Sequence, residues 1–326
     1  MKAIWYEANG AARDVLTYGE MPTPEPGAGE VLVRLHASGV NPSDWKTRGG
    51  SRPMTAARII PHSDGAGVIS AVGSGVDSSR IGTRVWVWNG QWKRPFGTAA
   101  EFIALPSAQA MPLPDSVSFE AGACFGIPVL TALRALLTDG GVAGQSVLVA
   151  GGAGSVSHYA IQFAKRLGAR QVITTVSSTA KAAHASAAGA DACIDYKRED
   201  VAARVKELTS GRGVDRVVEV DLGGNIALLR DVLAQDGICA AYGSNTALVT
   251  IPFSPMLVSG AAIRFFIVYE LSAAARAECE AVLARFLAEG GVQHTIAATM
   301  PLAGCVAAHE LVEAGTAMGN VVLTMP

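Results

Sequence analysis

"VLVAGGAGSVSHYAIQFAKRLG", from Val147 to Gly168, places an apolar run, three glycines and a segment of helical period one after another. Apolar side chains recur in its second half at the spacing of one helix face, and they are Val156, Tyr159, Ala160, Phe163, Ala164 and Leu167. A strand, a glycine turn and an amphipathic helix in this order are the context in which a glycine-rich loop binds the pyrophosphate of a dinucleotide. The stretch therefore predicts a cofactor loop, with a plain strand-to-helix turn as the alternative.

The residue types of this loop suit a phosphate. Gly151, Gly152 and Gly154 let the backbone turn sharply and come close to a pyrophosphate, whose charge meets the free N–H groups and the positive end of the following helix. Ser157 stands where such loops usually carry another glycine, but that glycine serves helix-to-strand packing, for which a serine is small enough. The loop residues expected to contact the cofactor are Gly151, Gly152, Ala153, Gly154, Ser155 and Val156.

Outward from the loop, the chain has two halves with different periodicity. Up to about Ala123 it consists of short strand-like runs and turns, with "EVLVRLHA" (30–37) alternating along one face and "GAGVISAVGSGV" (65–76) joining two runs through glycines. From Gln145 onward, runs such as "QVITTV" and "DRVVEV" alternate with helical segments, which is typical of a doubly wound parallel sheet. We expect a β-rich domain over 1–123, completed by 270–326, and a doubly wound nucleotide-binding domain over 124–269.

Composition narrows the classes of function. A chain of 326 residues with 50% hydrophobic residues can fill two cores. The formal net charge of −2 gives no attraction to nucleic acid, and the apolar run 261–271 is interrupted by Arg264 and Glu270, so no membrane span is expected. The five cysteines are scattered without CxxC spacing, which predicts reduced thiols, a cytoplasmic protein and no structural zinc site.

The segment after the second strand of the nucleotide-binding half indicates which dinucleotide binds. An NAD site places an acidic residue about 20 residues past the loop, on the ribose 2′-hydroxyl. This chain has "TTVSSTAK" (174–181) there, in which Ser177 and Ser178 can hydrogen-bond a phosphate and Lys181 supplies a positive charge. The pattern favours NADPH, although Lys181 taken alone is equally compatible with an ordinary solvated lysine.

Several stretches together resemble the quinone oxidoreductase, zeta-crystallin-like branch of the medium-chain dehydrogenase/reductase superfamily. They include "ASGVNPSDWKTRGG" (37–50), "SDGAGVISAVGSGV" (63–76), "GACFGIPVLTALRAL" (122–136), the glycine loop, "IDYKRED" (194–200) and "AAHELVEAGTAMGNVVL" (307–323). The resemblance covers essentially the whole chain. It implies a GroES-like catalytic domain, a Rossmann domain that binds NADPH, and a homodimer formed through the nucleotide domains.

The resemblance also assigns roles by position. Asn41 and Asp44 are expected in the active site and Thr131 beside the nicotinamide, while Lys181 and Tyr196 flank the adenosine 2′-phosphate. The remaining residues expected to border the cofactor are Gly243, Ser244, Phe266, Ile267, Val268 and Asn320.

Zinc-dependent relatives need a cysteine near positions 41–44 and a histidine ahead of "GAGV". Here no cysteine precedes Cys124, and Ser63 and Asp64 precede the glycines. His62 is displaced by one position, and we interpret it as a turn or surface residue. We therefore expect no metal ion, and with it no Lewis acid for alcohol oxidation.

Hydride transfer to an electron-poor acceptor needs no metal, so the sequence predicts an NADPH-dependent quinone reductase acting on a small molecule. Asn41 is a candidate to hydrogen-bond the acceptor carbonyl or else to hold a loop, and Lys46 a candidate proton donor or else a solvent-facing lysine. The alternatives are an NADPH-dependent enone or enoyl-thioester reductase and, in another class, an NADPH-binding structural or RNA-associated protein.

Overall fold

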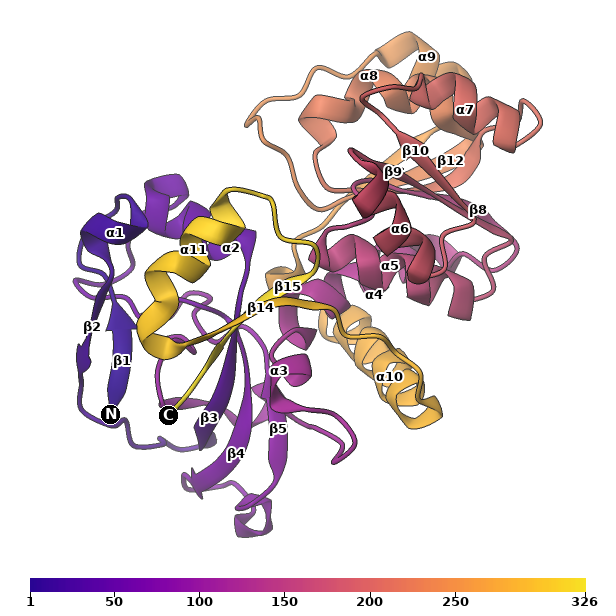
Figure 1. Ribbon diagram of the computed structural model, residues 1–326. Coiled ribbons are helices and arrows are strands. Elements are labelled where there is room, and N and C mark those ends of the chain that lie inside the picture. Colours follow the sequence, from indigo (N-terminus) through magenta and orange to yellow (C-terminus); the bar gives the residue numbers. More distant parts are fainter. The chain divides into compact units, whose positions relative to one another are not determined.

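The computed structural model describes residues 1–326, which divide into two compact units (Figure 1). The first unit comprises Met1–Ile127 and His294–Pro326, and the second comprises Pro128–Gln293. The sequence analysis places the domain boundaries at 123/124 and 269/270, whereas the two units of the structure meet at 127/128 and 293/294. The second boundary therefore differs most. The cause is α10 (Ala273–Glu289), which packs within the second unit: Phe286 lies 5.3 Å from Phe163 between ring centroids, and Arg276 Nη2 donates to the Val268 carbonyl at 2.8 Å.

The first unit is built on a seven-stranded sheet in the order β14-β15-β3-β4-β5-β7, with β6 also paired to β3. The strands are β3 (Glu30–Val40), β4 (Asp64–Val72), β5 (Arg84–Val87), β6 (Phe102–Pro106), β7 (Ala110–Pro112), β14 (Ile296–Pro301) and β15 (Asn320–Thr324). All pairs except β14 with β15 are antiparallel, and a separate hairpin joins β1 (Lys2–Trp5) to β2 (Thr17–Glu20). The tail strand β15 pairs with β3 within this unit.

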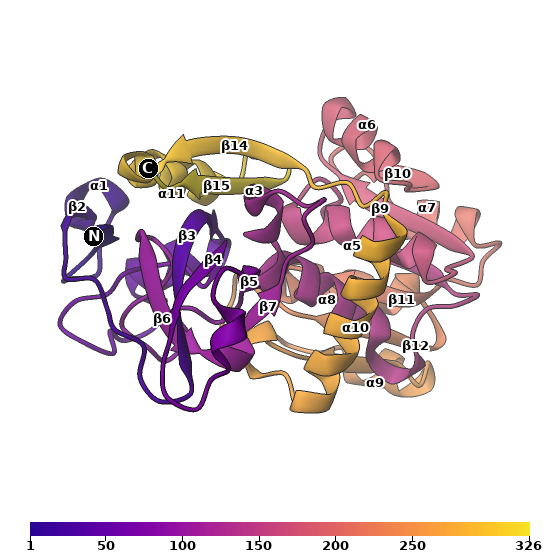
Figure 2. The same ribbon diagram turned by 90° about the horizontal axis from the view of Figure 1, so that it is seen from below.

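The core of this unit follows from the alternation of side chains along its strands, in which every second residue points to the same face of the sheet. Val31, Val33 and Leu35 point to one face of β3 and are buried with residues of β4, β5 and β6. The run 65–76, interpreted from the sequence as two strands, contains only β4, because the chain turns at Gly73, where a Cβ would lie 1.7 Å from the Gly27 carbonyl oxygen. The α-helices of the unit are α1 (Ala12–Val15), α2 (Pro42–Lys46), α3 (Phe119–Gly122) and α11 (Cys305–Glu313). Figure 2 shows α11 alongside β14 and β15.

The second unit is an entirely parallel six-stranded sheet in the order β10-β9-β8-β11-β12-β13. Its strands are β8 (Ser146–Val149), β9 (Gln171–Val176), β10 (Ala192–Asp195), β11 (Val214–Glu219), β12 (Leu233–Ala241) and β13 (Ala262–Phe265). Its other α-helices are α4 (Leu130–Leu137), α5 (Ser155–Arg166), α6 (Thr179–Ala187), α7 (Val201–Leu208), α8 (Leu222–Val232) and α9 (Phe253–Val258). Counted along the chain this is the 3-2-1-4-5-6 order of a dinucleotide-binding Rossmann sheet, which confirms the predicted fold class.

Shorter helical turns complete the chain. They are η1 (Thr47–Ser51), η2 (Ser78–Arg80), η3 (Ser107–Gln109), η4 (Phe125–Val129), η5 (Thr138–Gly140), η6 (Val268–Glu270) and η7 (Leu302–Gly304). No helix of the protein has both the length and the apolar character needed to cross a membrane.

Candidate functional site

The glycine loop lies between β8 and α5, at the point where the strand order of the second unit reverses. Its glycines are required for different reasons. Gly151 has φ +67°, a left-handed conformation that favours glycine, and a Cβ on Gly152 would lie 2.2 Å from Oγ1 of Thr174 in β9. Gly154 caps α5 at φ −74°, and the atom nearest to an added Cβ is the Gly151 carbonyl oxygen, 3.4 Å away.

The loop geometry fits a dinucleotide phosphate. The first turn of α5, which begins at Ser155 and Val156, has N–H groups without intrahelical acceptors and no acidic side chain. Ala153 is buried, whereas a Cβ on Gly154 would make only ordinary contacts, at 3.4 Å and beyond. The contact that forbids a side chain at Gly152 is with β9, so this glycine serves sheet packing, and the approach of a phosphate is left to the rest of the loop.

Ser157 lies on the packing side of α5. It is buried, and its hydroxyl donates to the Ala150 carbonyl oxygen at 2.7 Å, which ties the helix to the end of β8. The residue that replaces the usual glycine thus makes a bond of its own.

Ser157→Gly is expected to lower the melting temperature, because it removes this buried bond and places glycine inside a helix, each worth about 1 kcal/mol. Ser157→Ala, which removes only the bond, should lose about half as much. Differential scanning calorimetry of both variants beside the parent protein measures the two contributions. An unchanged melting temperature in Ser157→Gly would show that the bond stabilises nothing.

The residues predicted to select the nucleotide gather at the carboxyl edge of β9 and β10. Ser178 caps α6 and its Oγ accepts from the Lys181 backbone N–H at 3.3 Å, which places Lys181 in the first turn of that helix. Tyr196 follows β10, donates its N–H to the Val176 carbonyl at 3.1 Å and has an exposed side chain. The structure therefore brings Ser177, Ser178, Lys181 and Tyr196 to one edge of the sheet.

A pocket of about 480 Å³ opens at the carboxyl ends of β12 and β13. Four residues predicted from the resemblance line it, namely Gly243, Ser244, Phe266 and Ile267, whereas the predicted Val268 does not line it and is buried in η6. A Cβ on Gly243 would lie 2.3 Å from the Val220 carbonyl oxygen, so the chain must carry glycine here. Tyr242, Thr246 and Val249 also line the pocket and were not predicted.

Glu219, at the end of β11, is a polar residue of this region that the sequence interpretation missed. It is buried and accepts from the Asp221 N–H at 2.6 Å and from Asn225 Nδ2 at 3.0 Å. Burial raises the pKa of its carboxyl. The signal was present in "DRVVEV" (215–220), where an acid occurs within an apolar strand next to the strand that carries the glycine loop.

Two further predicted residues lie in different units. Thr131 is buried in α4 of the second unit. Asn320 begins β15 of the first unit, where its Nδ2 donates to the carbonyl of Thr295, the residue before β14, at 3.0 Å.

In the first unit, Asn41 and Asp44 form a buried polar cluster with Asp64. β3 ends at Val40 and Asn41 caps α2, which brings its N–H 2.7 Å from Asp44 Oδ2. Asn41 Nδ2 donates to Asp64 Oδ2 at 2.9 Å, and the same oxygen accepts the Ile127 N–H at 3.0 Å. The other oxygen of Asp64, Oδ1, is buried without a partner.

Burial makes these carboxyl groups weak acids. Burial raises the pKa of Asp44 to about 7, although the hydrogen bond from the Asn41 N–H favours the charged form and so acts in the opposite direction. It raises the pKa of Asp64 well above its ordinary value, and the neighbouring charge of Asp44 adds to the effect. The cluster therefore holds a proton under conditions in which exposed carboxyls have lost theirs.

Lys46 lies in the last turn of α2 and is half-buried, with its Nζ 5.8 Å from the centroid of the Trp45 ring. Within the same unit, the Arg52 guanidinium lies 4.4 Å from the centroid of Trp92.

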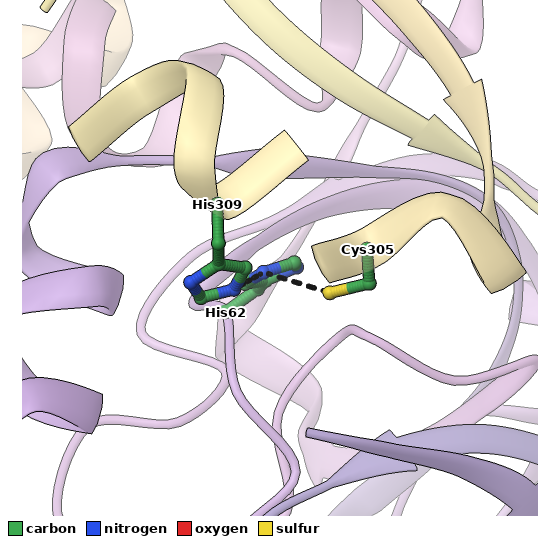
Figure 3. A group of neighbouring side chains, drawn as sticks. All are labelled: His62, Cys305 and His309. Carbon is green, nitrogen blue, oxygen red and sulfur yellow. Dashed lines mark hydrogen bonds between the residues drawn. The ribbon is translucent and has the colours of Figure 1, made fainter. Parts of the chain in front are cut away.

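The interpretation of His62 as a turn or surface residue is wrong. Its side chain is fully buried, and its Nε2 lies 2.9 Å from Nε2 of His309 (Figure 3). Cys305 lies 4.0 Å from the same nitrogen. The available signal was the pair Cys305 and His309, one helical turn apart in a segment of helical period, but its partner is far away in the sequence.

Comparison with known proteins agrees with both units. Residues 27–115 match the alcohol dehydrogenase GroES-like domain family, and residues 155–289 match the zinc-binding dehydrogenase family. A quinone oxidoreductase of Pseudomonas aeruginosa is 36% identical over 252 residues, which cover 76% of this chain and 75% of that protein. The chain belongs to the quinone oxidoreductase branch of the medium-chain dehydrogenase/reductase superfamily. It is an oxidoreductase.

Other members of the superfamily show the range of its chemistry. The trans-enoyl reductase tazE of Aspergillus terreus is 35% identical over 218 residues, which cover 61% of this chain and 70% of that protein. The structure of Escherichia coli quinone oxidoreductase complexed with NADPH superposes with a TM-score of 0.89 at 27% identity, covering 99% of this chain and 100% of that one.

Proposed function

We propose that this oxidoreductase reduces a quinone with NADPH, without a metal ion at the reacting centre. The observation that carries the proposal is the bond between Asn41 and Asp64, because it lies where zinc-dependent relatives need a cysteine and a histidine. An amide and a carboxyl bonded to each other are poor substitutes for that soft ligand pair. The names of the Pseudomonas and Escherichia coli relatives support a quinone as the acceptor.

The cofactor is NADPH, as in the Escherichia coli structure, and when bound it supplies the hydride. Gly151, Gly154 and the first turn of α5 would hold the pyrophosphate. Ser177, Lys181 and Tyr196 would hold the 2′-phosphate, because they are gathered at one edge of the sheet and "SSTAK" (177–181) contains no acidic residue to repel it. The pocket bordered by Gly243, Ser244, Phe266 and Ile267 would accept a further part of the cofactor. Val268, Thr131 and Asn320 remain proposed neighbours from the resemblance alone.

NADPH is expected to bind at least about tenfold tighter than NADH, a difference near 1.4 kcal/mol. Lys181→Glu should narrow that gap by weakening NADPH, because a carboxylate would face the 2′-phosphate. Fluorescence titration with both cofactors measures the ratio. Lys165→Glu is the control, since Lys165 is paired with Asp191 at 2.9 Å on another helix and should leave the ratio unchanged. Equal affinities of the parent protein for NADPH and NADH would contradict the assignment.

Asn41 is proposed to stabilise the acceptor oxygen. One hydrogen of its Nδ2 is bound to Asp64, which fixes the amide plane and leaves the second hydrogen for a carbonyl on which negative charge develops. Asp44 and Asp64 hold a proton next to that amide, so the reduced acceptor can take up a proton near the point at which it gains charge. Lys46, at the end of α2, the helix that Asn41 caps, remains a proposed proton donor or anion contact.

Turnover against a panel of acceptors with constant NADPH tests the function. Quinones should be reduced more than about tenfold faster than simple ketones, because an electron-poor acceptor needs no Lewis acid to accept a hydride. A metal chelator in the assay should leave quinone turnover unchanged. Comparable rates on unactivated ketones, or loss of quinone turnover with the chelator, would refute the proposal.

Reduction of an activated double bond is the second candidate, and the similarity to the Aspergillus terreus trans-enoyl reductase favours it. A quinone and an activated double bond both suit the Asn41 amide, so the amide does not discriminate between the two functions. Adding enones and enoyl thioesters to the same panel of acceptors does. The faster class identifies the substrate.

We also propose a cytoplasmic homodimer formed through the nucleotide-binding units. Five free cysteines support a reducing compartment. β13 is an edge strand, and exposed apolar side chains lie on it and on α9, namely Phe253, Leu257, Val258 and Phe265. An edge strand flanked by exposed apolar residues suits pairing with a second copy.

A further inference from the structure

His62, Cys305 and His309 form a closed cluster inside the first unit. Cys305 and His309 lie one turn apart on α11 and therefore share a helix face, and His62 lies just ahead of β4. All three side chains are fully buried, and their potential ligand atoms lie within 4.8 Å of one another (Figure 3). His62 has φ +75°, an uncommon conformation for a non-glycine residue, so the chain accepts backbone strain to aim this ring inward.

The hydrogen bonds around His62 determine its tautomer. Thr98 Oγ1 must donate to the Asp64 carbonyl oxygen at 2.6 Å, because a carbonyl can only accept. Ser38 Oγ must then donate to Thr98 Oγ1 at 2.8 Å, and it accepts from His62 Nδ1–H at 2.9 Å. Nε2 of His62 consequently carries a lone pair, and without an ion it accepts from Nε2–H of His309 at 2.9 Å. Metal binding therefore requires the His309 proton to move to Nδ1, which is buried without a partner. A hydrogen bond from the remote ring nitrogen, here Nδ1–H to Ser38 Oγ, is the arrangement that orients histidine ligands in metal sites.

We propose that His62, His309 and Cys305 bind one thiophilic metal ion, Cu⁺ or Zn²⁺, in a site closed to substrate. Two imidazoles and a thiolate are the donors that these ions prefer. With metal–nitrogen distances of about 2.0–2.1 Å, two bound nitrogens lie about 3.3 Å apart, so the rings must separate slightly from the present 2.9 Å. The Cys305 sulfur must move inward from 4.0 Å, so the two side chains of α11 adjust in opposite directions, Cys305 toward His62 and His309 away from it.

The charge balance of the cluster is compatible with a bound cation. The hydrogen bonds place the one proton of the His62 ring on Nδ1, so this ring is neutral. Metal binding requires the Cys305 thiol to release its proton to solvent, against the burial that raises its pKa. The buried guanidinium of Arg48 favours the thiolate, whereas Asp44 opposes it. This site differs from the hydride-transfer site, and it revises the expectation, drawn from the sequence, that the protein binds no metal.

Metal analysis of the whole protein tests the site. The protein is loaded with Zn²⁺ or, under reducing conditions, with Cu⁺, and is then dialysed against a weak chelator. The parent protein should retain about one ion per chain, and Cys305→Ser and His309→Gln should retain at least about tenfold less. The matched control is Cys279→Ser, which places the same hydroxyl at an equally buried cysteine of α10 and should retain the ion.

A measurement on the parent protein keeps the test independent of whether the variants fold. Co²⁺ should give a thiolate-to-cobalt charge-transfer band in the parent protein and in Cys279→Ser, but not in Cys305→Ser. Quinone turnover per folded chain should be the same with and without the ion, so a failure of the proposed function would not be mistaken for a failure of the site. No retained ion and no cobalt band in the parent protein, or equal loss in Cys279→Ser and Cys305→Ser, would overturn the proposal.

Discussion

Gly152→Val is expected to destabilise the nucleotide-binding unit by roughly 2–5 kcal/mol, because the new side chain meets a strand that cannot move away. A Cβ at this position would lie 2.2 Å from Thr174 Oγ1 and 3.0 Å from Thr174 Cβ, in the middle of the sheet. Thr174 is fully buried and its hydroxyl donates to the Val149 carbonyl at 2.7 Å, so rotating it aside would break a buried bond. The melting temperature and the far-ultraviolet circular dichroism of the variant measure the loss.

Gly154→Val is the matched variant. Gly154 has an ordinary φ of −74°, and an added Cβ meets nothing closer than 3.4 Å, so the fold should tolerate the change. Because the side chain would occupy the phosphate path, NADPH affinity should fall by on the order of 1–3 kcal/mol. The pair thus separates a packing glycine from a binding glycine. A Gly152→Val protein that melts like the parent protein would contradict this division.

The sequence was sufficient for the Rossmann sheet because its signals are local. The apolar run, glycines and helical period of 147–168 predict β8, the loop and α5 within a few residues, and each later strand–helix alternation repeats the same argument. The boundary at α10 was not predictable in this way. Its buried face, with Cys279, Leu283 and Phe286, has the same amphipathic pattern whichever unit it packs on.

The residues of the candidate site also fall into those that local sequence specifies and those that only the fold brings together. Glycine positions and the cluster at Ser177 to Lys181 could be predicted because short motifs specify them. The partner of Gly152 could not, because Thr174 reaches it across the sheet from β9. His62 shows the limit most clearly: the sequence presents a single histidine, and only the pairing of β15 with β3, beside α11, brings the C-terminal Cys305 and His309 to it.

Asp44→Asn is expected to flatten the pH dependence of stability in the first unit. Burial raises the pKa of Asp44 to about 7 in the folded protein, whereas the unfolded chain titrates near its ordinary value of 3.8. The folded state therefore binds an extra proton between these values. The stability that this proton contributes is fully present below the unfolded pKa and is lost as the pH rises through the folded pKa.

Between about pH 5 and pH 8, the parent protein should therefore lose roughly 2–3 kcal/mol more stability than Asp44→Asn, since each pKa unit corresponds to about 1.4 kcal/mol. The melting temperature of both proteins across this range gives the difference. Burial raises the pKa of Asp64 and the charge of Asp44 adds to the effect, so removing that charge lowers the pKa of Asp64 and further flattens the variant's profile. Asp14→Asn, at an exposed acid of α1, is the control and should follow the parent protein. Parallel profiles for the parent protein and Asp44→Asn would mean that Asp44 is ionised in the folded state, and the proton proposed to lie beside Asn41 would then have to reside on Asp64.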